Sequence, residues 1–312
     1  MAELVLHHYD ASPFSEKVRT ALGIKGLAWR DVQIPDVMPK PEYTPLTGGY
    51  RRTPSLQIGA DVWCDSAAIL AELERRFPQP SLHPAGDRGL AQALGFWSDR
   101  PFFMAAVTLV FGAAGEAVSR RFIEDRAHMA GNFDVARMRE ARPVMREQYR
   151  AHLGFLDQQL ADGRPFVTGD APGLADLHPW HVIWFLRRAA PSEAGLIDGF
   201  SRIIAWEARM AAIGHGEPQA MSAADALEIA RDSIPDTLPE EDPGEPGGLH
   251  PGQRVEMAPD DYGRDLVAGE VVASNAGEIA LLRRDPDLGE VVVHFPRAGF
   301  VVYPRGETRG HG

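Results

Sequence analysis

The sequence predicts a multidomain chain with an α/β unit first, an all-α unit in the middle and a small β unit at the end. Three observations carry this prediction. Strand-like and helix-like runs alternate over residues 1–78, helical spacing dominates residues 87–232, and short β-rich runs fill residues 251–305. Residues 233–250 are acidic and dense in Pro and Gly, a composition typical of a linker.

Length and composition exclude several classes of protein. The chain has 312 residues, more than one ordinary domain, and its 44% apolar and 24% charged residues are those of a folded globular protein. A net charge of -12 without clustered Lys and Arg disfavours nucleic-acid and membrane-surface partners. The most apolar stretch, residues 102–114, is shorter than the about 20 residues that span a bilayer. Cys64 is the single cysteine and the start lacks the layout of a signal peptide, so a cytoplasmic protein is expected.

The first unit is expected to begin with a βαβ arrangement. Residues 4–9 form a β-prone run, and Pro13 stands where a proline can begin a helix. That helix ends before Gly26, and residues 29–34 predict a second strand. A ββα half follows, with its parts at residues 54–58, 62–63 and 65–77.

The spacing of apolar residues predicts the helices of the middle unit and the strands of the last one. The expected helices cover about residues 87–115, 134–161, 173–190, 199–212 and 222–231. Pro143 predicts a kink in the second of them, and Ser222 with Asp225 resembles a capping box. Short β-rich runs separated by Asp, Gly and Pro after residue 251 predict a small antiparallel β barrel or sandwich.

The turn after the first strand places Ser12 at the N-terminal end of a helix. Unpaired N–H groups and the positive end of the helix dipole favour an anion there, and a thiolate held at such a place has a lowered pKa. Ser12 and Ser15 occupy the positions where dithiol redox proteins carry Cys-x-x-Cys, so dithiol redox chemistry is excluded at this turn. Taken alone, Ser12 is more readily explained as a plain helix N-cap without a catalytic role.

A second group of residues lies further along, where Arg52-Thr53-Pro54 is followed after a short hairpin by Asp65-Ser66. A cis proline would turn the Thr53 backbone outward, so that a peptide can pair with it as an added strand. Ser66 and the first N–H groups of its helix could bind a carboxylate, and Asp65 could accept from an ammonium group. Glutathione has these features, because it joins a cysteinyl backbone to a γ-glutamyl end that carries both charges.

Three stretches, SPFSEKVRTALGIKGL, RRTPSLQIG and CDSAAILAELERRF, resemble the N-terminal domain of cytosolic glutathione S-transferases (GSTs) over about residues 4–77. The Ser-Pro-Phe-Ser form is similar to the serine-type members, such as the zeta and tau classes, and to the omega class with its cysteine replaced. The resemblance implies a thioredoxin-like fold for the first unit and a GST C-terminal-like helical bundle for the second. It also implies glutathione as co-substrate and a homodimer through these two units.

The same resemblance implies a role for each site residue. Ser12 is the implied catalytic residue, with its hydroxyl at the sulfur of glutathione, and Thr53 meets the cysteinyl backbone. Asp65 and Ser66 hold the γ-glutamyl end, and Arg51 or Arg52 replaces the family's lysine near the glycine carboxylate. The expected glutathione-binding set is Ser12, Phe14, Arg52, Thr53, Pro54, Asp65 and Ser66.

The helical unit extends the resemblance. FVTGDAPGLADLHPWHVIWFL is similar to the family's capped central helix, with Gly173 where a Ser or Thr cap is usual and Asp176 three residues later. In zeta- and tau-like enzymes the electrophile lies against the start of this unit. The expected electrophile pocket is therefore made of Phe103, Met104, Val107 and Phe111.

Two further sets of side chains have alternative interpretations. Cys64 is interpreted as a small buried hydrophobe, since free cysteines are commonly buried. His178 and His181 lie three residues apart on one helix face with Asp176 nearby, and could ligate a metal. No further ligand has a matching spacing, so we expect core or surface histidines and no metal.

The predicted activity is that of a glutathione transferase. The Ser12 hydroxyl and the helix start would stabilise the thiolate, which attacks a small apolar electrophile by addition, displacement or cis-trans isomerisation. Tyr9 could offer its phenol to the thiol, as in tyrosine-type transferases, but the Ser-Pro-Phe-Ser pattern favours Ser12. Two alternatives stay open: a non-catalytic glutathione-binding scaffold whose C-terminal β domain recruits a protein partner, and a catabolic enzyme such as a dehalogenase or a ring-acid isomerase.

Overall fold

The computed structural model describes residues 3–131 and 133–304 of the chain. Its first part has the expected βαβ and ββα halves with one short helix between them. The elements are β1 (Val5–His8), α1 (Pro13–Ile24), β2 (Ala28–Gln33), α2 (Thr44–Thr47), β3 (Ser55–Ile58), β4 (Asp61–Cys64) and α3 (Ser66–Arg76). β1 pairs in parallel with β2 and antiparallel with β3, and β3 pairs antiparallel with β4. This is the thioredoxin-like arrangement.

Two capping residues determine where α1 and α3 begin. The Ser12 Oγ accepts from the Ser15 N–H at 3.2 Å, and Pro13 supplies the first helical residue of α1. The Asp65 Oδ1 accepts from the Ala67 N–H at 2.9 Å at the start of α3. Since β1 and β4 are both antiparallel to β3, they run in the same direction and both helices start at one edge of the sheet.

The helical part follows, and its first expected helix is divided. α4 (Arg88–Trp97) and α5 (Phe103–Ala114) are joined by a wide π-helical turn, η1 (Ser98–Phe102). Pro101 lies inside this turn. Proline has no backbone N–H, so one hydrogen bond of the ordinary helix is missing here, and the turn is wider. The remaining helices are α6 (Arg120–Ala130), which was not expected, α7 (Val135–Gln159), α8 (Leu174–Ala189) and α9 (Ser201–Ile213).

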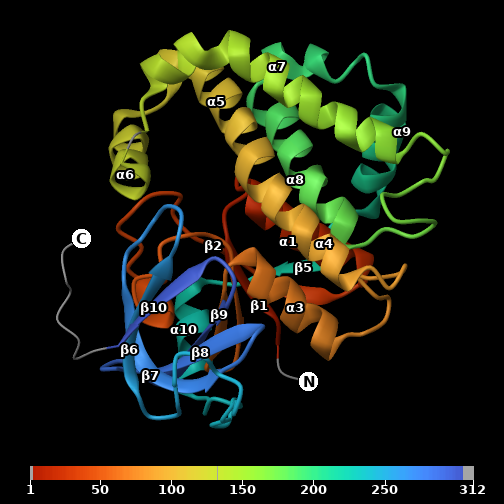
Figure 1. Cartoon of the computed structure of the whole chain (residues 1–312). Coiled ribbons are helices and arrows are strands. Elements are labelled where there is room, and N and C mark those ends of the chain that lie inside the picture. Colours follow the sequence, from red (N-terminus) through yellow and green to blue (C-terminus); the bar gives the residue numbers. More distant parts are fainter. Residues whose placement is uncertain (1–2, 132, 305–312) are drawn as a thin grey trace.

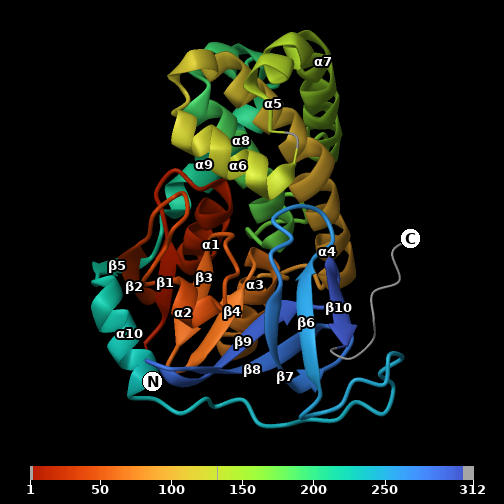
Figure 2. The same cartoon turned by 90° about the vertical axis from the view of Figure 1, so that its left-hand side faces the viewer.

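The helical part and the α/β part share one hydrophobic core. Buried side chains run without a break from Leu6 in β1 through Leu22 in α1 to Leu109 in α5 and Trp206 in α9. Figures 1 and 2 show the helices stacked on one side of the sheet, with α1 below α8. Among the residues that the structure describes, none of the helices combines the length and the hydropathy of a membrane span.

After α9 the chain returns to the α/β part. β5 (Glu217–Ala220), which was not expected, pairs in parallel with β2. α10 (Ala223–Arg231) begins at the predicted cap, where the Ser222 Oγ accepts from the Asp225 N–H at 3.1 Å. Its Ala226 packs with Val5 and Val32, so this helix covers the sheet of the first part.

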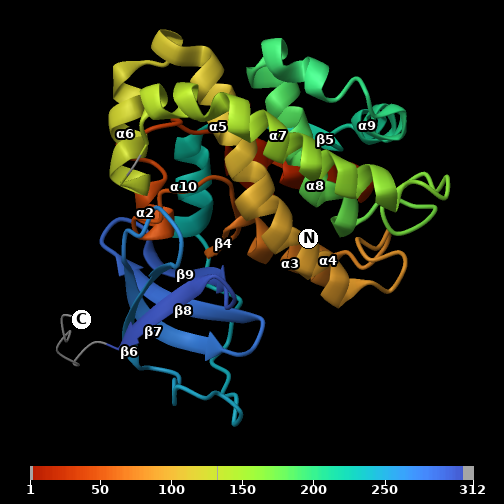
Figure 3. The same cartoon turned by 45° about the horizontal axis from the view of Figure 1, so that its top comes forward.

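Five antiparallel strands form the C-terminal part, as predicted: β6 (Arg254–Pro259), β7 (Val267–Ser274), β8 (Glu278–Asp285), β9 (Gly289–Pro296) and β10 (Phe300–Pro304). They extend the first sheet, because β9 pairs in parallel with β4. The result is a ten-stranded sheet in the order β10-β6-β7-β8-β9-β4-β3-β1-β2-β5. Figure 3 shows these strands beside β4 and below α6.

A cluster of buried polar side chains connects the C-terminal strands to β4. His294 in β9 stacks on Trp63 in β4 at 4.3 Å, and its Nε2 lies 3.0 Å from the Asp61 Oδ1. The expected linker joins the same group, because the Thr237 hydroxyl donates to the Asp61 Oδ1 and the Asp236 N–H to the Asp61 Oδ2, both at 2.6 Å. The C-terminal strands are therefore fixed to the α/β part.

Candidate functional site

The loop before β3 forms one wall of the candidate site. Its Thr53–Pro54 peptide bond is cis. The buried Lys40 ammonium donates to the Thr53 hydroxyl at 2.9 Å and to the Arg51 carbonyl at 3.1 Å. Burial, together with the nearby Arg126 and Arg51, lowers the pKa of Lys40 to about 7. Lys40 thus supports the loop from the protein side.

The start of α3 forms the facing wall. Asp65 has φ 79°, a left-handed conformation that costs a non-glycine residue about 1–3 kcal/mol and that is concentrated at functional sites. One of its carboxylate oxygens accepts from the Ala67 N–H at 2.9 Å and the other from the Tyr50 hydroxyl at 3.4 Å. Burial raises the pKa of Asp65. Ser66 follows at the first helical position, where free N–H groups favour an anion.

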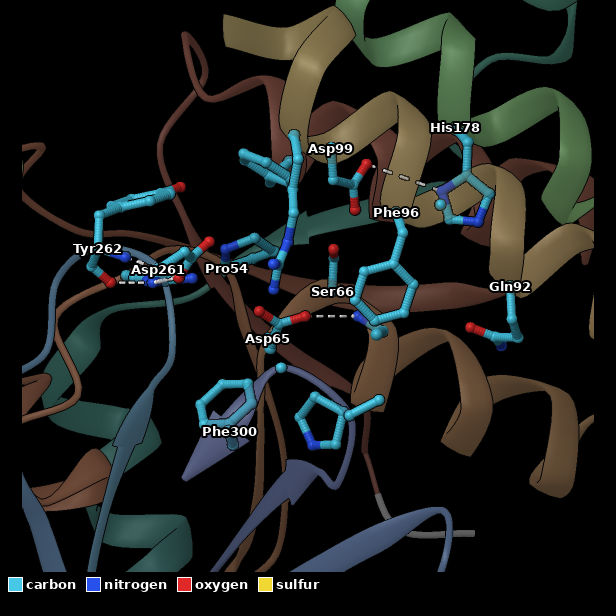
Figure 4. A pocket seen from close by; sticks show the side chains of 18 of the residues that line it. Pro54, Asp65, Ser66, Gln92, Phe96, Asp99, His178, Asp261, Tyr262 and Phe300 are labelled. Atoms are coloured by element: carbon cyan, nitrogen blue, oxygen red, sulfur yellow. Dashed lines mark hydrogen bonds and ion pairs between the residues drawn. The ribbon is translucent and has the colours of Figure 1, made fainter. Parts of the chain in front are cut away.

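These two walls enclose a hollow of about 110 Å³, and all three parts of the chain line it. Figure 4 shows Pro54, Asp65 and Ser66 in the middle of the view, Gln92, Phe96 and Asp99 on the helical side, and Tyr262 and Phe300 on the side of the C-terminal strands. The lining residues from the first part are Phe14, Tyr50, Arg52, Thr53, Pro54, Asp65, Ser66 and Ala67; those from the helical part are Gln92, Gly95, Phe96, Asp99, Arg100 and His178; those from the C-terminal part are Asp261, Tyr262, Pro296, Ala298, Gly299 and Phe300.

Six of the seven residues predicted to bind glutathione line this hollow, and Ser12 does not. Ser12 is 2% exposed, and its hydroxyl accepts the capping hydrogen bond from Ser15. The alternative phenol also lies outside the hollow. The Tyr9 hydroxyl accepts from the Arg126 Nη2 at 3.4 Å, and burial raises the pKa of Tyr9. A catalytic role for Ser12 therefore stays a prediction.

An ion pair between a buried lysine and a partly exposed aspartate lies at the edge of the hollow. The Lys17 ammonium in α1 donates to both carboxylate oxygens of Asp99, at 2.6 and 2.7 Å. Burial alone would raise the pKa of Asp99, but Lys17 holds it far below its ordinary value, so the carboxylate is ionised. The π-helical turn η1 brings Asp99 to this place, where it faces the hollow and α1 together.

The two histidines of α8 complete this group. The Nδ1 of His178 lies 3.8 Å from Asp99, and the Nε2 of His181 lies 3.6 Å from it. Burial and Lys17 lower the pKa of both imidazoles, which are therefore neutral at pH 7. Asp176 points elsewhere, because it caps α8. No group of three or more potential ligands for a metal ion occurs in the described part of the chain.

The four residues expected to form an electrophile pocket do not line the hollow. The Phe103 ring packs edge-on against Phe14 at 4.9 Å, and Val107 is 9% exposed. Met104 is 48% exposed on the outside of α5. Phe111 packs against Phe133 at 4.9 Å, under the helix α6 that was not expected. Their role in binding an electrophile stays a prediction.

Several residues that line the hollow were not predicted from the sequence. Asp99 depends on the π-helical turn, whose only local sign is Pro101 in an otherwise apolar helix. Asp261 and Tyr262 lie in the acidic stretch PDDYGRD between two predicted strands. Its charge could have been noticed, but no sequence pattern connects this stretch to residues near position 52.

Comparisons with known proteins agree with this geometry. Family models described as glutathione S-transferase, N-terminal domain and C-terminal domain match residues 6–81 and 120–209. The crystal structure of a GST-like protein from Pseudomonas syringae is 37% identical, with a TM-score of 0.82, and the match covers 98% of this chain and 100% of that one. The match to this relative therefore includes the C-terminal strands.

Two curated proteins are more distant. FtsZ-localized protein A of Caulobacter vibrioides (strain NA1000 / CB15N) is 27% identical over 206 residues, which are 64% of this chain and 80% of that protein. A probable glutathione S-transferase of Solanum tuberosum is 26% identical over 179 residues, 57% of this chain and 70% of that protein. The two domain models and the relative that spans nearly the whole chain establish that this protein belongs to the cytosolic glutathione S-transferase superfamily.

Proposed function

We propose that this chain binds glutathione in the hollow and activates its thiolate for attack on, or isomerisation of, a small apolar electrophile. The observation that carries the proposal is the placement of Ser66 and Asp65 opposite the Thr53–Pro54 turn, with Arg52 beside it in the same hollow. A glutathione molecule requires four kinds of contact: one for each of its two carboxylates, one for its ammonium group and one for its cysteinyl backbone.

Each part of glutathione has a candidate partner in the hollow. The γ-glutamyl carboxylate would lie at Ser66 and the start of α3, where a hydroxyl and the helix dipole favour it. Its ammonium would face Asp65. The cysteinyl backbone would pair with the main chain of Thr53, and the glycine carboxylate would meet Arg52.

The thiol would then lie at the start of α1. The helix dipole and the Ser12 hydroxyl would favour the thiolate, which lowers the pKa of the thiol at that place. The thiol proton passes to solvent and the sulfur attacks the electrophile. The apolar face of α5, including Phe103 and Val107, is the proposed position of that electrophile.

The binding half of the proposal is tested by calorimetric titration with glutathione. Ser66→Ala should weaken binding at least tenfold, because a hydrogen bond to a charged group contributes about 1.5–3 kcal/mol. An unchanged dissociation constant for this variant would place the ligand elsewhere.

The catalytic half needs a control for the loss of a helix cap. Ser12→Ala should reduce turnover of a general conjugation substrate at least tenfold. Ser222→Ala removes a capping hydroxyl of the same geometry, which accepts from the third helical N–H of α10, and should leave turnover unchanged. Equal rates for both variants would remove Ser12 from the mechanism.

A second candidate function is a glutathione-binding scaffold without turnover. The buried, hydrogen-bonded hydroxyl of Ser12 outside the hollow favours it. The name of the Caulobacter relative, FtsZ-localized protein A, describes a localisation rather than a reaction. Binding of glutathione without conjugation across a panel of electrophiles would select this candidate, in which the C-terminal β strands recruit a protein partner.

The assembly and location of the protein are part of the same proposal. Family members commonly dimerise, and we propose a homodimer that uses the α/β and helical parts. Light scattering on the purified chain would overturn this if it gave the mass of one chain. The cytoplasm is the proposed location, since glutathione keeps thiols such as that of Cys64 reduced there.

A further inference from the structure

The loop between β6 and β7 borders the hollow, and we call its residues 260–265 the strap. The Asp260 N–H donates to the Gly299 carbonyl at 2.9 Å, in the turn between β9 and β10. The Gly263 N–H donates to the Met129 carbonyl of α6 at 2.7 Å. The strap therefore bridges the C-terminal strands and the helical part.

The two outer aspartates of the strap lie near basic side chains from other parts of the chain. The Asp260 Oδ1 lies 2.7 Å from the Arg100 Nη2 of η1. The Asp265 Oδ2 lies 3.5 Å from the Arg51 Nη1, and its Oδ1 lies 3.7 Å from the His128 Nε2. These pairs hold the strap against both the helical part and the loop before β3.

The central aspartate faces the arginine that lines the hollow. The Arg52 Nη2 donates to the Asp261 carboxylate and to the Tyr262 carbonyl, and the guanidinium lies 4.0 Å from the centre of the Tyr262 ring. The Arg52 side chain is 13% exposed. Gly263 has a φ of +58°, and a Cβ there would lie 3.3 Å from the Arg52 Nε, so the strap encloses this side chain closely.

We propose that the strap is an internal competitor at the glutathione site: Asp261 occupies Arg52 in the ligand-free protein, and the glycine carboxylate of glutathione displaces it. This inference rests on the proposed function, because it takes glutathione as the ligand. Figure 4 shows Asp261 and Tyr262 on the side of the hollow opposite Gln92, with Pro54 between them. The C-terminal part, through the strap, then sets the affinity of a site whose proposed glutathione contacts lie in the first part.

Asp261 has two opposite effects on the affinity for glutathione, and their balance decides whether loss of its charge strengthens or weakens binding. Asp261 orients the guanidinium, which favours ligand binding by lowering the entropy lost on association. It also neutralises the guanidinium, which removes most of the attraction for a second carboxylate at contact distance. The carbonyl and the ring of Tyr262 still orient Arg52 when the Asp261 charge is removed. Neutralisation is therefore the larger effect, and loss of the charge strengthens binding.

The test compares Asp261→Asn with Asp265→Asn in the full chain by calorimetric titration. The asparagine keeps an oxygen to accept from the Tyr262 N–H, which the Asp261 Oδ1 now accepts at 2.8 Å. Asp265→Asn removes the same charge from the same strap, but its partners Arg51 and His128 do not line the hollow. Two ligands are used: glutathione, and its glycine monoethyl ester, in which the carboxylate proposed to meet Arg52 is blocked.

Asp261→Asn should bind glutathione at least tenfold more tightly than the unmodified chain, which is about 1.4 kcal/mol. Asp265→Asn should change the dissociation constant less than twofold, and the gain in Asp261→Asn should fall below twofold with the ester. Unchanged or weaker binding by Asp261→Asn, or an equal gain with the ester, would overturn the strap proposal while leaving glutathione binding in place. Absence of glutathione binding in all three proteins would overturn both proposals.

Discussion

Asp176 offers a sharp test of how the helical part is held in place beside the site. Its side chain is fully buried at the start of α8. The Oδ1 accepts from the Val167 N–H and from the Trp206 Nε1, each at 2.8 Å, and the Oδ2 accepts from the Gly173 N–H at 3.1 Å. Asp176→Ala would leave three buried donors without an acceptor.

The expected change in the free energy of unfolding on Asp176→Ala is the sum of two opposing contributions. Each buried donor left unpaired costs about 1–3 kcal/mol, so three together cost about 6 kcal/mol at the middle of that range. Burial raises the pKa of Asp176 to about 6, so keeping the carboxylate ionised at pH 7 disfavours the folded state by about 3 kcal/mol. Alanine removes this penalty, and we expect a net loss of about 3 kcal/mol in the free energy of unfolding.

Urea unfolding at pH 7, followed by tryptophan fluorescence, measures this loss. The control is Asp176→Asn, whose amide oxygen retains the two hydrogen bonds that the Oδ1 accepts, so this variant should lose at least about 1 kcal/mol less than the alanine variant. A loss below about 1 kcal/mol for Asp176→Ala, at an unchanged m-value, would refute the reasoning. So would an equal loss in both variants, because it would mean that the retained hydrogen bonds contribute nothing.

The remaining predictions concern titration and reactivity. The folded pKa of Asp176 is raised to about 6 from 3.8, so the unmodified chain should lose stability relative to Asp176→Asn as pH rises from 4 to 7, measured by urea midpoints. The folded pKa of Lys40 is lowered to about 7 from 10.5, so the unfolded state binds more protons between these values and stability should rise with pH from 7 to 9; Lys40→Met should remove this rise. Burial raises the pKa of the Cys64 thiol, so a thiol-reactive disulfide reagent at pH 8 should label it only in urea, and rapid labelling of the native chain would contradict the burial.

Local signals explain how much of the site could be predicted. Ser12 with Pro13, and Asp65 with Ser66, begin helices through contacts within three residues of the cap, and such contacts leave a pattern in the sequence. The capped start of α10 at Ser222 was found in the same way. For these elements the residue types and their spacing were sufficient.

Contacts between distant segments explain what could not be predicted. The ion pair of Lys17 with Asp99 joins residues 82 positions apart and depends on a π-helical turn that changes which residues of the helix face α1. The C-terminal strands were likewise expected to form a separate unit, because nothing in β4 or β9 alone shows that these two strands pair with each other. Strand pairing depends on the packing of both faces of a sheet, which is settled only when all the layers are assembled.

Local sequence was sufficient to predict where α1, α3 and α10 begin and the turn at Pro54, while the residues that would face glutathione stay a prediction. The contact of Arg52 with Asp261, 209 positions away, and the position of the C-terminal strands beside the hollow became visible only in the assembled fold. The two kinds of interaction differ in their range. Caps and turns act over a few residues of backbone, whereas the strap reaches Arg52 only because β9 pairs with β4 and buries the apolar side chains between them.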